Sequence, residues 1–78
     1  MVQIIRVGPI DGGWVVDCEG AAEPAVFLSG GKAEAIARAT AARLAASGVD
    51  VRVEIVDRSQ RPAGSSWFSG DYPTDGGA

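Results

Sequence analysis

Ser29-Gly30-Gly31-Lys32 stands before a helical segment and has the residue types of a phosphate-binding loop. A Walker loop follows the pattern G-x-x-x-x-G-K-[ST], whose last hydroxyl binds magnesium. Here Val26 stands where the first glycine is required, and Ala33 follows the lysine. Both requirements fail, so we interpret Ser29 as a helix N-cap and expect no nucleotide or other cofactor.

The sequence also lacks the residues that most nucleophilic and zinc sites require. The 78 residues include no histidine and one cysteine, Cys18. Ser-His and Cys-His arrangements are therefore excluded, as are zinc sites built from histidine or several cysteines. Cys18 alternates with Trp14 and Val16 on a predicted strand, so we interpret it as a small core side chain.

Three carboxylates, Asp17, Glu19 and Glu23, form an acidic edge. On a strand Asp17 and Glu19 share a face, where a carboxylate pair could bind a divalent cation or exchange protons. No apolar pocket or basic partner accompanies them in the sequence, so we interpret them as solvated surface. We predict no catalytic residue, no metal site and no enzymatic activity.

Arg52, Arg58 and Arg61 lie near the aromatic pair Trp67-Phe68. Arginine binds phosphate and aromatic rings stack on bases, so this set defines one hypothesis, a small nucleic-acid-associated domain. Carboxylates interleave with the arginines, and ten acidic against seven basic residues give a net charge of −3. Because nucleic-acid binders usually carry a basic footprint, we keep this hypothesis as the alternative only.

Hydrophobic periodicity predicts the elements that position these residues. Strands are expected over 2–7, 14–18 and 49–56, with short extended pieces at 25–28 and 65–68. The alanine-rich stretch 32–47 predicts a helix, in which Ala33, Ile36, Ala37, Thr40, Ala41 and Leu44 form the buried stripe. Asp11-Gly12-Gly13 predicts a hairpin turn, and Gly48 a left-handed helix stop.

This order predicts an α+β fold, a small two-layer sandwich with one helix packed on one face of the sheet. The sheet is expected to have three or four strands and to be mostly antiparallel. Residues 1–68 are predicted to form a single domain, and residues 69–78 a disordered C-terminal tail. A single cysteine, no targeting segment and no long apolar stretch predict a cytoplasmic protein without membrane contact.

The corner Asp11-Gly12-Gly13-Trp14-Val15-Val16, followed by the helix 32–39, resembles the bacterial domain-of-unknown-function family 2188. The shared pattern is D-G-G-W-x-V and then K-x-E-A-I, and the resemblance covers roughly residues 2–61. It implies the fold already argued and brings no activity. Two features depart from the family pattern: the run Asp57-Arg58-Ser59-Gln60 after the last clear strand, and the acidic charge balance.

One helix leaves the other sheet face uncovered. We expect Trp14, Val16, Val51, Val53 and Ile55 under the helix. Ile5, Val7, Val15 and Val56 are then expected on the open face, where an apolar patch needs a cover. The segment Trp67-Phe68, a second copy of the chain or another protein would each supply one.

The first hypothesis is therefore a non-enzymatic module that binds protein, itself or another chain, through the open sheet face or a sheet edge. A homodimer is one form that this would take. The candidate interaction residues are Ile5, Val7, Val15, Val56, Trp67 and Phe68.

Overall fold

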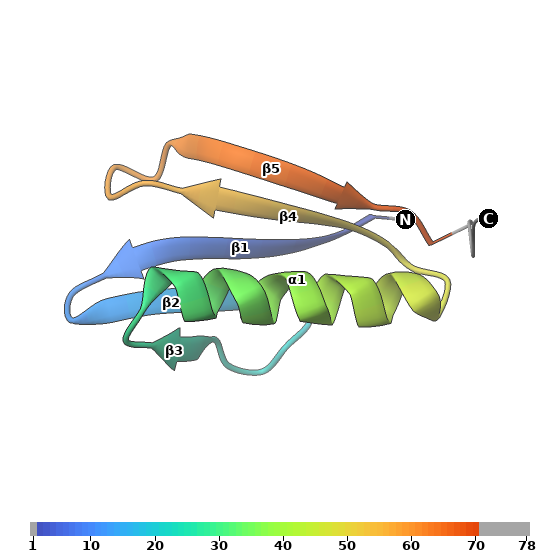
Figure 1. Ribbon diagram of the computed structural model, residues 1–78, viewed down its shortest axis with the longest axis horizontal. Helices are drawn as coiled ribbons and strands as arrows, with labels where there is room; N and C mark the ends of the chain where they lie inside the picture. The colour runs from blue at the N-terminus through green and yellow to red at the C-terminus, as the bar shows by residue number, and fades with distance from the viewer. Residues whose placement is uncertain (1, 71–78) are drawn as a thin grey trace.

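A computed structural model describes residues 2–70; of the expected tail, residues 71–78 lie outside the described residues. Strands and one helix follow in the order β1 (Val2–Ile10), β2 (Gly13–Cys18), β3 (Ala25–Phe27), α1 (Gly30–Ala46), β4 (Asp50–Val56) and β5 (Pro62–Phe68). In this part of the chain the strands form a single sheet, and α1 lies across one of its faces (Figure 1). The predicted α+β class is confirmed.

Within residues 2–70 the sheet has five strands in the order β3-β2-β1-β4-β5, more than the three or four expected. The additional strand is β5, which begins at Pro62 and is longer than the predicted piece at 65–68. Proline is tolerated there because the start of an edge strand can spare a backbone donor. Strands β1 and β4 pair in parallel, and the three other pairs are antiparallel. The parallel pair arises because α1 carries the chain back across the sheet before β4 begins.

Helix α1 begins and ends as its sequence predicts. The Ser29 Oγ accepts a hydrogen bond from the Lys32 backbone N–H at 3.1 Å, and Gly48 adopts a φ of +100°. The predicted ion pair between Glu34 and Arg38 forms at 2.8 Å. Ile36 is 45% exposed, so its placement in the buried stripe is wrong.

The helix buries only a narrow row of alanines, Ala33, Ala37 and Ala41, each 0% exposed. Their spacing of four residues places them on one line along the helix, and Ile36 lies one residue, about 100°, to the side. Methyl side chains allow the helix axis to approach the sheet closely. Facing these alanines is a core of branched side chains: Ile5, Val7, Val16, Val51 and Val53.

Trp14 closes the core at the start of α1, next to the hairpin turn in which Gly12 has a φ of +80°. Its ring lies directly against Gly30: a Cβ built on that glycine would be 2.8 Å from the ring. The DGGW corner is therefore a structural corner, in which a turn delivers an aromatic ring beneath the helix N-terminus.

Candidate functional site

The expected position of Ile5 and Val7 on the open sheet face is wrong. Both side chains lie in the core under α1, with exposed fractions of 0% and 1%. The register explains this: Val7 is directly opposite Val16 on β2 and Ile55 on β4. Directly opposed residues share a sheet face, and those partners belong to the helix side. Ile5 and Val7 are thus unavailable to a partner.

Val15 and Val56 do lie on the open face, away from α1. They line a hollow of about 260 Å³ together with Arg6, Gly8, Pro9, Ile10, Asp17 and Gln60. Val56 covers Gly8, since a Cβ on that glycine would lie 2.5 Å from the Val56 Cγ2 atom. The two valines therefore pack locally over the sheet backbone and do not form a broad apolar patch.

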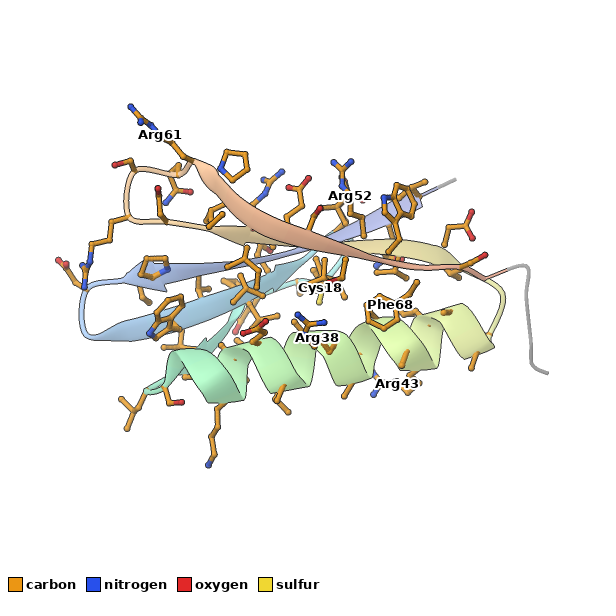
Figure 2. All side chains as sticks on the ribbon, turned by 45° about the horizontal axis from the view of Figure 1, so that its top comes forward. Cys18, Arg38, Arg43, Arg52, Arg61 and Phe68 are labelled. Carbon is orange, nitrogen blue, oxygen red and sulfur yellow. The ribbon has the colours of Figure 1, made fainter. Side chains whose placement is uncertain are left out.

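Trp67 and Phe68 are separated by the sheet. Phe68 packs against the core on the helix side, and Figure 2 shows its ring between β5 and α1. Trp67 is opposite Arg52 in the β4–β5 register, lies on the open face and is 60% exposed. Strand β5 extends the sheet beside β4, so the Trp67-Phe68 segment does not cover the open face.

A row of charged side chains crosses the middle of the open face and ends on Trp67. The Arg6 Nε donates to the Glu54 Oε1 at 3.2 Å, and Arg52 forms an ion pair with the other Glu54 oxygen. The Arg52 guanidinium lies over the Trp67 ring, 5.9 Å from its centroid. We call these four residues the open-face row. Ion pairs this exposed contribute little to stability, about 0–1 kcal/mol, so their main effect is to hold side chains in place.

Arg6 was not singled out in the sequence, and Glu54 only as a charge that cancels its neighbours. The alternation of side chains along β1 could have placed Arg6 on the open face, because Arg6 shares a sheet face with Ile4 and not with Ile5. That alternation would have placed Ile5 in the core. The partnership between Arg6 and Glu54 depends on the parallel register of β1 and β4, for which the sequence carries no local signal.

The three arginines of the nucleic-acid hypothesis are not brought together as one surface. Arg52 projects from the middle of β4 away from α1, whereas Arg61 lies directly before the start of β5 (Figure 2). Arg58 and Arg61 belong to the turn between β4 and β5, where the Asp57 Oδ1 accepts from the N–H groups of Ser59 and Arg61 at 2.8 and 3.0 Å. Carboxylates accompany both locations, Glu54 at one and Asp57 at the other.

The two edges of the sheet differ sharply. Strand β3 has three residues and follows Pro24, so it offers little backbone for pairing. Strand β5 has seven residues, PAGSSWF, and none of them is charged. Natural edge strands are usually protected by charged side chains, shortness or bulges. The protection on β5 is an irregularity opposite Ile55 and Val56, which leaves Gly64–Phe68 as a regular, uncharged edge.

The acidic edge has a structural use. The Glu19 Oε1 accepts from the Ile4 backbone N–H at 3.1 Å, and the Glu19 carbonyl accepts from the Gln3 amide at 2.8 Å. Glu19 thereby fastens the end of β2 to β1. Within residues 2–70, no three His, Cys, Asp or Glu side chains are grouped as metal ligands would be.

Cys18 is half-buried against the core, and this position sets its reactivity. Burial raises the pKa of the thiol, the Asp17 carboxylate raises it further, and Arg43 opposes both. We expect iodoacetamide to alkylate Cys18 at pH 8 several-fold more slowly than a cysteine in an unfolded peptide, because the thiolate is the nucleophile.

The same shift has a pH consequence for stability. The folded chain favours the neutral thiol, so this contribution is complete below the ordinary thiol pKa of about 8.5. It is lost as the pH rises through the higher folded pKa. Urea unfolding between pH 7 and 10 should show the native protein losing more stability than Cys18→Ala; equal losses would contradict the assignment.

Comparisons with known proteins add no relative: no protein-family model, curated protein or solved structure matches the chain. In the described part of the chain, α1 is too short and too polar to cross a membrane.

Proposed function

We propose that this protein is a non-enzymatic interaction module that binds an extended polypeptide segment along β5, by strand addition to the sheet. The observation that supports this most directly is the regular, uncharged edge of Gly64–Phe68 beside the exposed Trp67. Main-chain hydrogen bonds would supply affinity, and side chains on alternate faces would supply selectivity.

The open face is the weaker candidate for the contact. Its centre holds the open-face row, in which Arg6 and Arg52 are each already paired with Glu54. A partner on this face would have to desolvate those charges, which costs free energy unless each regains a partner. The edge presents backbone groups and one aromatic ring, and it demands no such compensation.

Trp67 connects the edge to the open face. The Arg52 guanidinium lies over its ring, a contact that favours an indole placed against the sheet. An aromatic side chain that is already ordered loses little entropy when it contacts a ligand. We assign Trp67 as the side chain that an added strand would contact first.

The nucleic-acid hypothesis with Arg52, Arg58 and Arg61 stays a prediction. It requires binding of a DNA or RNA oligomer that weakens steeply with salt, whereas strand addition to an uncharged edge is insensitive to salt. A cytoplasmic location, expected from the single cysteine Cys18, also stays a prediction.

Selection of peptides from a displayed random library on the immobilised protein tests strand addition. We expect selected peptides to shift the amide NMR signals of Ser65 and Trp67, and to lose at least ten-fold in affinity for Ser65→Pro. Proline is tolerated where an edge-strand N–H faces solvent, so this variant removes a donor without removing a bond to β4. A proline in the helix, such as Ala42→Pro, would break α1 and cannot serve as a control. The control is therefore Ser59→Ala, a substitution at an exposed turn position away from the edge. Selected peptides that shift only open-face or helix signals would contradict the proposal.

A further inference from the structure

We infer that the strand added to β5 is the β5 of a second copy of this chain, paired antiparallel about a two-fold axis at Ser66. This inference rests on the proposed function and names its partner. It joins two sheets into one, with both helices on the same side.

The direction of the hydrogen bonds along the sheet identifies the free backbone groups. The Glu19 N–H donates to the Ile4 carbonyl at 3.1 Å, so even-numbered residues of β1 bond toward β2 and odd-numbered ones toward β4. Across the parallel β1–β4 pair, the odd-numbered residues of β4, such as Val53, turn their backbone groups away from β1 and toward β5. Val53 is directly opposite Ser66, so the backbone N–H and C=O of Ser66 turn toward β4. Ser65 and Trp67 then turn their N–H and C=O groups outward, away from the sheet.

The regular part of the edge pairs well with itself. Centred on Ser66, an antiparallel copy brings Ser65 opposite Trp67, which are the two residues with outward backbone groups. It also brings Gly64 opposite Phe68. An aromatic residue across from a glycine stabilises the pairing of an edge strand that contains glycine. A small residue thus opposes a large one at the four positions that flank the central Ser66 pair. The irregularity at the start of β5 disfavours a register centred on Ser65, which would include it.

Charge supports a second copy over a charged strand. The five central residues carry no charge. On the helix side of the axis, the Arg38 Nη1 donates to the Ser66 Oγ at 3.3 Å, and the Arg38 charge is paired with Glu34 at 2.8 Å. Around β5, one end has Arg58 and Arg61 against Asp57, and the other has Asp50, whose Oδ1 accepts from Gly70 N–H at 2.7 Å. An antiparallel pair places the net positive end of each copy at the negative end of the other. The pairing is short, so the dimer belongs to the small, transient class of interfaces.

Sedimentation equilibrium of the full chain from micromolar to millimolar concentration is the first test. We expect the average mass to rise from one toward two monomers, with only a small decrease in association at high salt, where the charges at the two ends are screened. We expect Ser65→Pro to remain monomeric with unchanged far-UV circular dichroism. A native chain that stays monomeric at millimolar concentration would overturn the inference. So would a dimer that forms unchanged in Ser65→Pro.

Disulfide trapping tests the register. In a Cys18→Ala background, Ser66→Cys places two thiols directly opposite each other across the axis, at the spacing of facing side chains in a non-hydrogen-bonded pair. Diamide should convert the Ser66→Cys variant into a covalent dimer at least ten-fold faster than it converts Ser65→Cys, the matched control. Faster trapping of Ser65→Cys would exclude this register. If the chain is monomeric yet selects peptides along β5, the dimer fails and strand addition stands. If it is monomeric and selects none, both fail.

Discussion

Replacing Ile5 by alanine is expected to lower the free energy of unfolding by about 3–4 kcal/mol, the cost of removing a fully buried isoleucine side chain from a packed core. Ile5 is 0% exposed and packs with the alanine row of α1. A domain of 78 residues has a total stability of roughly 4–12 kcal/mol, so this single change removes much of it. Urea unfolding followed by circular dichroism measures the loss.

The neighbouring residue supplies the matched control. Ile4 has the same side chain, is half-buried and points to the open face. Ile4→Ala should therefore cost about 1 kcal/mol or less, because little packed volume is lost. Equal costs for the two variants would contradict the assignment of Ile5 to the helix side, and a larger cost for Ile4 would reverse the faces of β1.

Trp14→Ala is expected to cost about 3 kcal/mol, at the lower end for a large aromatic side chain because Trp14 is half-buried. The ring supports the first turn of α1 at Gly30, so the hydrogen-bonded amides of residues 32–34 should lose more protection than those of β4. Thermal unfolding and amide exchange measure the two effects. A variant that keeps its stability but loses a binding partner would show that Trp14 is an interaction residue and not a structural one.

A double-mutant cycle with Gly30→Ala isolates the contact. In the native chain the new methyl group meets the Trp14 ring, so Gly30→Ala should destabilise by about 1–3 kcal/mol. In the Trp14→Ala background the space is free and alanine favours the helix, so the same change becomes neutral or stabilising. The same destabilisation in both backgrounds would contradict the packing of Trp14 on Gly30.

Local sequence signals were sufficient for much of the fold. The Asp11-Gly12 turn, the Ser29 cap, the Gly48 stop and the alternation of 49–56 are each determined within a few residues, and the structure confirms them. The one helix and its place on one sheet face followed from these elements. Such features are predictable because the residues that specify them are neighbours in the chain.

The features that the sequence did not predict depend on pairing between strands that are distant along the chain. Two isoleucines stand side by side in β1, so apolar character alone did not decide which faces the helix; the pairing of Val7 with Val16 and Ile55 does. The segment containing Trp67 has glycine and serine in place of branched residues, so its strand character depends on pairing with β4. The uncharged edge of β5, which carries the proposed site, became visible only once its neighbour was known.

Amide hydrogen exchange along β5 tests the availability of this edge most directly. In dilute native protein we predict an alternating pattern: the amides of Ser65 and Trp67 exchange rapidly, whereas those of Gly64, Ser66 and Phe68, which turn toward β4, are protected. At millimolar concentration the first two should gain protection as strands pair. If Ser65 and Trp67 are as protected as Ser66 in dilute protein, the edge is already covered within one chain, and strand addition at β5 is contradicted.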